Sequence, residues 1–180
     1  RLRTDAVDLR KPTLFHGSLE QVIRAESQAR SGHVPDDPPW TATILSATDP
    51  SQAPEGQDNL YMYMPAPVRS TRGWNVDRNS AEDRLLDGAA RVMGDIRGVE
   101  IGRISETPED LESRLAAKNG CIYHVDQVIT RLGALRPARG WSGHKSPVAG
   151  LFLSGAGTHP GGGVSGIPGQ LAARALMRSI

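Results

Sequence analysis

The feature that most constrains the fold of this chain is an apolar segment that runs into a glycine-rich stretch near its end. Residues 148–153 are mostly apolar and predict a buried parallel strand. Residues 155–166 are rich in glycine, which lets a backbone turn tightly and approach a ligand closely. Pro168 suits the first turn of a helix, and residues 171–177 have a helix-forming composition. The segment therefore predicts a strand, a tight turn and a helix, in that order.

Two interpretations of the glycine-rich turn are open. Backbone N–H groups clustered at a turn and at a helix N-terminus attract anions, which favours a phosphate-binding turn. Gly161, Gly163 and Gly166 also match the dinucleotide-binding pattern, but that pattern needs a full strand–helix–strand unit and an acidic residue about 20 positions on. Only residues 167–180 follow, so this match by itself is weak support for a cofactor. A flexible linker is the alternative, and the flanking strand and helix patterns make it the less favoured one.

The rest of the chain alternates between helix and strand patterns. Ser18 with Gln21 predicts a capping box, and the helix that follows is expected to end at Gly32. Residues 40–47 and 60–64 predict two neighbouring antiparallel strands. Further along we expect a helix from Ser80 to about Gly98, a strand over residues 99–105, and a helix that follows the N-cap Thr107 and stops at Asn119–Gly120. These patterns predict an α+β fold.

Residues 150–169 resemble the carboxy-terminal signature of FAD-dependent oxidoreductases related to phytoene desaturase, within the wider amine-oxidase-like flavoprotein group. The match is long and specific. Shorter segments resemble the same group, namely residues 15–17, 49–56, 107–112 and 124–127. The resemblance thus covers most of the 180 residues.

The resemblance implies that the chain is the carboxy-terminal part of a dehydrogenase or desaturase that passes a hydride from an organic substrate to FAD. The amino-terminal unit that holds the FAD pyrophosphate and ribose in that family has no counterpart here, and the chain begins with Arg1 rather than Met. We therefore expect FAD in the full-length protein, and an inactive chain without the missing amino-terminal half. The alternative is a stand-alone, non-catalytic binding or assembly module derived from a flavoprotein.

The same resemblance places the cofactor against the glycine-rich turn, where glycine allows a close approach of the backbone. The expected cofactor-binding residues are Gly155, Ala156, Gly157, Thr158, His159, Pro160, Gly161, Gly162, Gly163 and Val164. His159 is the one candidate for a catalytic role. Its alternative role is to shape the turn before Pro160.

A shift to Arg, Gly and Pro between Arg131 and Gly150 marks the expected domain boundary. By resemblance, residues 1–147 are part of a substrate-binding domain, an antiparallel or mixed sheet with flanking helices. Residues 148–180 are the last strand, glycine turn and helix of a Rossmann-like FAD-binding domain. Because most strands of that parallel sheet come from the missing half, we expect residues 151–154 either to self-associate or to be locally disordered.

Charge and hydropathy limit the partners. The chain has 21 Lys and Arg against 20 Asp and Glu, so no net field attracts nucleic acid. It holds no apolar run of about 20 residues that could span a membrane, and its start has no signal-peptide pattern. We expect a cytoplasmic protein whose substrate is small, organic and apolar.

Four further groups of residues have two interpretations each. Arg131, Arg136, Arg139 and Lys145 predict a solvated loop, or else a site for a phosphate or an anionic substrate. Residues 61–64 predict a core-facing stripe, or else the lining of an apolar channel. Asp126 predicts a helix cap before Gln127, or else a substrate contact. Cys121 predicts a buried structural thiol, because a strand over residues 121–125 would turn His124 to the opposite face; no spacing of His and Cys predicts a metal site.

Overall fold

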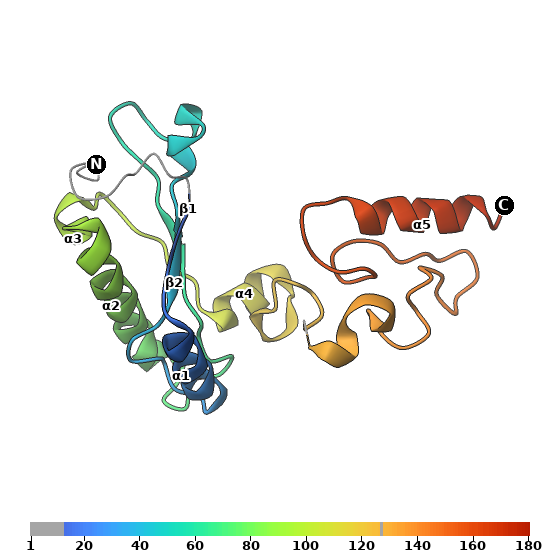
Figure 1. Cartoon of the computed structure of the whole chain (residues 1–180), viewed down its shortest axis with the longest axis horizontal. Helices are drawn as coiled ribbons and strands as arrows, with labels where there is room; N and C mark the ends of the chain where they lie inside the picture. The colour runs from blue at the N-terminus through green and yellow to red at the C-terminus, as the bar shows by residue number, and fades with distance from the viewer. Residues whose placement is uncertain (1–12, 127) are drawn as a thin grey trace. The chain divides into compact units, whose positions relative to one another are not determined.

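The computed structural model describes residues 13–126 and 128–180, which divide into two compact units (Figure 1). The first unit is Arg1–Asp110 and the second is Leu111–Ile180. The division at residue 147 that the family resemblance implies stays a prediction. No helix among the described residues is long and apolar enough to cross a membrane.

The first unit contains a three-stranded antiparallel sheet in the order β1 (Thr13–His16), β2 (Trp40–Thr43) and β3 (Tyr61–Tyr63). Helices and this sheet together make the fold α+β, as predicted, and the antiparallel pairing of β2 with β3 is confirmed. The chain enters a short 3₁₀ turn, Leu45–Ala47, within the predicted second half of β2. The sequence pattern missed β1, because four residues are too few to show an alternation of polar and apolar side chains.

The helices follow the predicted start signals in three cases. α1 (Leu19–Arg30) begins with the predicted capping box, in which the Ser18 and Gln21 side chains each accept from the other's backbone N–H. α4 (Pro108–Leu115) begins after Thr107, whose Oγ1 accepts from the Asp110 N–H at 3.3 Å. In the second unit, α5 (Ile167–Met177) carries its proline in the first turn.

The start of α2 (Trp74–Met93) was predicted wrongly, since the helix begins six residues before Ser80. Gly73 precedes it without any side-chain cap, so the sequence offers no start signal there. The predicted end near Gly98 falls in a separate short helix, α3 (Ile96–Val99), after the break at Gly94. A helix can therefore begin earlier than its cap signal when buried side chains such as Trp74 hold its first turn.

The core of the first unit lies between one face of the sheet and α2. Its central side chain is Trp40, which is 1% exposed and stacks on His16 with ring centroids 5.2 Å apart. A Cβ at Gly88 would lie 3.3 Å from Trp40 Nε1, so glycine lets the helix approach the indole closely. The other buried residues of this cluster are Ala42, Ile44, Leu86, Ala89, Met93 and Ile96. Burial of these side chains is the main stabilising contribution to this unit.

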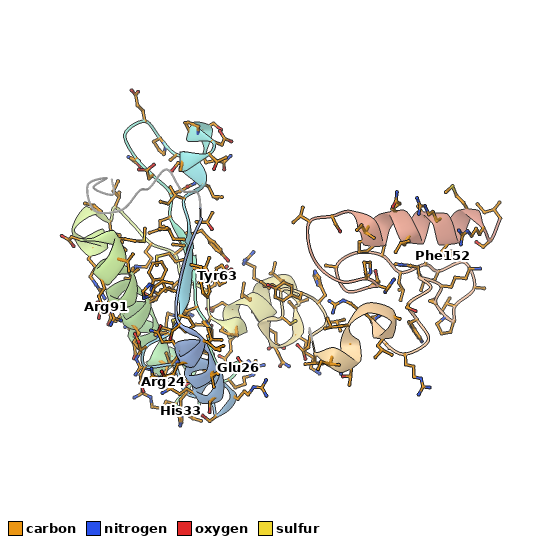
Figure 2. The ribbon with its side chains drawn as sticks, viewed as in Figure 1. Arg24, Glu26, His33, Tyr63, Arg91 and Phe152 are labelled. Carbon is orange, nitrogen blue, oxygen red and sulfur yellow. The ribbon has the colours of Figure 1, made fainter. Side chains whose placement is uncertain are left out.

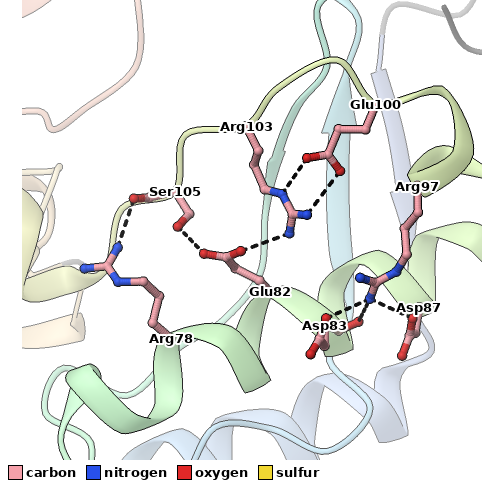
Figure 3. Close-up of polar contacts among 8 residues, drawn as sticks. All are labelled: Arg78, Glu82, Asp83, Asp87, Arg97, Glu100, Arg103 and Ser105. Atoms are coloured by element: carbon pink, nitrogen blue, oxygen red, sulfur yellow. Dashed lines mark hydrogen bonds and ion pairs between the residues drawn. The ribbon is translucent and has the colours of Figure 1, made fainter.

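Residues 100–106 form no strand, which corrects the prediction for residues 99–105. Side-chain contacts attach this segment to α2 instead (Figure 3). Arg103 pairs with Glu82 of α2 at 2.9 Å and with Glu100 at 2.9 Å, and Arg78 of α2 donates to the Ser105 carbonyl at 3.0 Å. Ile101 and Ile104 are 75% and 96% exposed, so the apolar positions that suggested a strand do not reach a core.

The buried Asp77 makes the start of α2 sensitive to acid. Its carboxylate accepts from Arg72 Nε at 2.8 Å and from the Ser70 hydroxyl. These hydrogen bonds, first Arg72 and then Ser70, lower the pKa of Asp77 from its ordinary value of 3.8. Because the folded pKa is lower than the unfolded one, the stabilisation is complete above about pH 4 to 5 and is lost as the pH falls through the folded pKa.

We therefore expect Asp77→Asn to lower the free energy of unfolding at pH 7, and to lower it by a smaller amount at pH 3. The measurement is urea denaturation of both proteins at the two pH values, followed by circular dichroism. The matched control is Glu55→Gln, which removes an exposed carboxylate in the same unit. An Asp77→Asn effect that is the same at both pH values would contradict this assignment.

In the second unit the predicted strand at residues 148–153 does not form. The segment makes one isolated antiparallel bridge, Lys145 to Phe152, rather than part of a parallel sheet. Val148 and Leu151 are 61% and 49% exposed, so the segment is not buried either. A parallel strand needs neighbouring strands on its hydrogen-bonding edges, and the described residues of this unit supply none.

Candidate functional site

The glycine-rich turn, residues 155–166, leads into the N-terminus of α5. Gly155 begins it with φ +89°, and its carbonyl accepts from the Thr158 N–H at 3.0 Å and from Thr158 Oγ1 at 2.9 Å. Gly166 ends it at φ +69°, as the left-handed N-cap of α5. Both positions need a backbone conformation that residues with a side chain rarely adopt. The predicted sequence of a tight turn followed by a helix is thus confirmed.

Most backbone N–H groups of the turn have no acceptor. Among the described residues, none accepts from the N–H groups of Gly157, Gly161, Gly162, Gly163 or Val164. A Cβ added at Gly155, Gly163 or Gly166 would meet no atom within 4 Å, so space lies open beside these three residues, whereas a Cβ at Gly157 would lie 3.5 Å from His124 Cβ. Free donors beside open space fit an anionic ligand, and they fit the diphosphate or ribityl oxygens of FAD.

Arg136 lies beneath this turn and is fully buried, with 0% of its surface exposed. Its Nε and Nη2 donate to the Ala156 carbonyl at 3.1 and 2.9 Å, Nη2 also donates to the Tyr123 carbonyl at 2.8 Å, and Nη1 donates to the Arg131 carbonyl at 3.3 Å. The favoured solvated-loop interpretation is therefore wrong for Arg136, although Arg131, Arg139 and Lys145 are exposed. The sequence missed this role because the pairing of a side chain with carbonyls up to 20 residues away leaves no local pattern.

Two histidines lie next to each other in this unit. His144 is 3% exposed, and its Nδ1 lies 3.0 Å from the Leu153 carbonyl. Because a carbonyl only accepts, Nδ1 carries the proton and Nε2 is left as an acceptor. The His144 and His159 rings lie 6.5 Å apart, and the buried His144 Nε2 and His159 Nδ1 have no hydrogen-bond partner among the described residues. His144 was not among the expected residues, and the catalytic role of His159 stays a prediction.

The tyrosines and methionines of residues 61–64 lie in different environments. Tyr61 and Tyr63 are 57% and 53% exposed on one face of β3 (Figure 2 labels Tyr63). Met62 and Met64 pack against the core on the other side. Core packing is thus the correct interpretation for the methionines and the wrong one for the tyrosines.

The remaining candidates show no site geometry. Residues 121–125 form turns rather than a strand, and Cys121 is a free, half-buried thiol. Asp126 is exposed and lies 4.0 Å from Arg131, while Gln127 lies outside the described residues. Within the described ranges no three His, Cys, Asp or Glu side chains come together as a metal site.

Known proteins resemble the chain over most of its length, although no protein-family model matches it. It is 30% identical over 161 residues to pyridine nucleotide-disulfide oxidoreductase domain-containing protein 2 of Rattus norvegicus. It is 31% identical over 157 residues to 4,4'-diapophytoene desaturase (4,4'-diaponeurosporene-forming) of Staphylococcus haemolyticus. It is also 32% identical over 131 residues to phytoene desaturase (lycopene-forming) of Pantoea ananas.

These matches cover much more of this chain than of the relatives. They span 87%, 83% and 71% of the chain, but only 28%, 29% and 26% of the respective relatives. The chain thus spans little more than a quarter of the length of these proteins. The sequence resemblance is confirmed: over most of its length the chain is similar to part of oxidoreductases related to phytoene desaturase.

Proposed function

We propose that this chain is the carboxy-terminal part of an FAD-dependent oxidoreductase of the dehydrogenase or desaturase type, in which the turn Gly155–Val164 contacts FAD. The observation that carries the proposal is the set of unpaired N–H groups beside open space in this turn. The names of the related desaturases and oxidoreductase support the reaction class. When bound, FAD would accept a hydride equivalent from a carbon atom of the substrate.

The contribution of the chain to this reaction is orientation and electrostatics. The N–H groups of Gly157 and Gly161–Val164 would hold the cofactor by donating hydrogen bonds to its oxygen atoms. His159 lies in the same turn, its ring 6.5 Å from that of His144, and its buried Nδ1 has no hydrogen-bond partner among the described residues. Exposed aromatic side chains on the sheet, Phe15, Tyr61 and Tyr63, are chemically suited to a small apolar organic substrate.

The test begins with the coding region upstream of Arg1, translated in frame. We expect it to continue into a strand, a Gly-x-Gly-x-x-Gly turn and a helix, and we expect the protein expressed from the extended frame to release FAD on denaturation. The 180-residue chain titrated with FAD should show no stoichiometric quenching of the flavin. A stop codon just ahead of Arg1, or an extended protein without flavin, would favour the non-catalytic module instead.

A matched pair of glycines tests the turn itself in the extended protein. Gly155 and Gly56 have φ of +89° and +75°, and a Cβ at either meets nothing within 4 Å. Replacement by alanine strains both backbones similarly, but only Gly155 lies in the proposed site. We expect Gly155→Ala to weaken FAD binding about tenfold and Gly56→Ala to leave it unchanged. Equal effects of the two replacements would argue against a cofactor at the turn.

The exposed segment of the second unit leads to a proposal about the isolated chain. A hollow of about 390 Å³ is lined by apolar side chains such as Val148, Leu151, Leu176 and Ile180 together with the polar residues Lys145, Ser146 and Ser179. We propose that two copies of the isolated chain associate through this surface, because residues 151–154 pair with the rest of their unit only through one isolated bridge and have no neighbouring strand among the described residues of one copy.

The measurement is sedimentation velocity over a range of concentrations. We expect a larger sedimentation coefficient at higher concentration, which Leu151→Asp abolishes. Ile104→Asp, which alters an equally apolar and even more exposed side chain, serves as the control and should associate like the original chain. A monomer at every concentration, with protected amides at residues 151–154, would contradict the proposal.

A further inference from the structure

We propose that Arg136 is a positioning residue that fixes the Ala156–Gly157 peptide so that the Gly157 N–H is presented to the cofactor. This inference rests on the proposed function, because it assigns one donor of the turn that would contact FAD. It concerns a residue that the sequence patterns name only as one of four basic residues and that the comparisons do not single out.

The Ala156 carbonyl is held by a two-pronged contact. Nε and Nη2 of Arg136 both donate to this one oxygen, at 3.1 and 2.9 Å. The same guanidinium is anchored by the Tyr123 and Arg131 carbonyls at 2.8 and 3.3 Å. The guanidinium is planar and its donors are fixed relative to one another. These four hydrogen bonds therefore fix the direction in which the Ala156 carbonyl points.

The direction of that carbonyl determines the direction of the next N–H. The Ala156–Gly157 peptide bond is not among the cis bonds of the described chain, so its C=O and N–H lie in the peptide plane and point in opposite directions. The carbonyl points at the buried Arg136, and the Gly157 N–H therefore points away from it. No described residue accepts from this N–H, whereas the neighbouring Thr158 N–H is used internally, on the Gly155 carbonyl at 3.0 Å.

Arg136 also brings a positive charge to the underside of the turn. No carboxylate of the described residues forms an ion pair with it, and all its recorded partners are carbonyl oxygens. Its side chain reaches the second half of the turn, where a Cβ at Gly161 would lie 3.8 Å from Arg136 Cδ. A buried cation without a counter-charge makes an anionic group on the opposite side of the turn more favourable.

A measurement on the unmodified 180-residue chain tests the orientation without any variant. In amide hydrogen exchange by NMR, we expect the Gly157 N–H to exchange rapidly and the Thr158 N–H to be protected. In a titration with FAD to millimolar concentration, we expect the Gly157 amide resonance to move in a saturable way. A protected Gly157 amide in the ligand-free chain would overturn the proposal, because that N–H would then be used internally.

Two arginine variants test whether Arg136 is the cause. Arg136→Met removes the guanidinium that donates to the Ala156 carbonyl. Arg139→Met removes a neighbouring exposed guanidinium and is the matched control. We expect Arg136→Met to shift the Gly157 amide resonance in the ligand-free chain and to weaken its response to FAD about tenfold, while Arg139→Met changes neither. The positioning role would be overturned if the Gly157 resonance and its response to FAD were the same in Arg136→Met as in the original chain.

The outcomes separate this inference from the proposed function. If the Gly157 resonance depends on Arg136 but does not respond to FAD, the positioning role stands as a structural property and the assignment of the Gly157 N–H to the cofactor fails, whereas the proposed function is decided by flavin release from the extended protein. If the resonance responds to FAD equally in all three proteins, the proposed function stands and the role of Arg136 fails. Should Arg136→Met unfold the second unit, the exchange rates of the unmodified chain still decide the orientation.

Discussion

Replacing Trp40 by alanine is expected to lower the free energy of unfolding of the first unit by about 3 to 5 kcal/mol. The indole is 1% exposed and lies between the sheet and α2, among the apolar side chains of the main cluster. Its removal loses the favourable free energy of transferring a large aromatic group from water to the core. It also leaves a cavity that the closely packed surroundings fill only in part. Since small domains are stable by only about 5 to 15 kcal/mol, this unit would be close to unfolded at 37 °C.

The measurement is urea denaturation followed by far-ultraviolet circular dichroism, which does not depend on the indole fluorescence that the substitution removes. Trp141→Ala is the control, because Trp141 is 37% exposed and its loss leaves no buried cavity. We expect its effect to be well under half as large. A midpoint that Trp40→Ala leaves unchanged would mean that the packing of β2 on α2 does not limit the stability of this unit.

Arg136→Met is expected to have the second largest effect, a loss of about 2 to 4 kcal/mol in the local stability of the second unit. Methionine fills much of the volume of the arginine stem but donates no hydrogen bond, so the carbonyls of Tyr123, Arg131 and Ala156 lose their donor together. This part of the chain has little regular structure apart from α5, so contacts between distant loops contribute a large share of its stability.

Amide hydrogen exchange measures this loss residue by residue. We expect faster exchange at Leu153 and Thr158, whose N–H groups are bonded to the His144 and Gly155 carbonyls, and unchanged exchange in α2. Arg139→Met again provides the control with the same loss of charge at an exposed site. Unaltered exchange at Leu153 and Thr158 in Arg136→Met would show that the four hydrogen bonds contribute little.

The parts of the fold that the sequence predicted are those determined by local chemistry. A cap residue and its partner three positions further along form their hydrogen bonds within one helical turn. Ser18 and Thr107 therefore predicted the starts of α1 and α4 correctly. The start of α2 depends instead on the burial of Trp74 against residues from elsewhere in the first unit, including Val34. Nothing near Gly73 in the sequence reports such a contact.

In the candidate site, too, only features that depend on local chemistry could be predicted from the sequence. The glycine-rich turn could be predicted, because glycine has a local conformational meaning. Arg136 could not be told from its basic neighbours, because its role depends on carbonyls that come close only when the loops fold together. Residues 148–153 have the composition of a buried strand, but that composition describes an environment with neighbouring strands that the described residues do not provide.

The attachment of residues 100–106 to α2 has a consequence for proteolysis. This segment is held by pairs of charges near the surface, such as Arg103 with Glu82, rather than by apolar burial (Figure 3). The screening length falls from about 10 Å at 0.1 M salt to about 3 Å at 1 M, while the Trp40 core is not weakened by salt in this way. Raising the ionic strength should therefore loosen the attachment of this segment more than it loosens the Trp40 core, and a protease that cuts after arginine would then cleave after Arg103 faster.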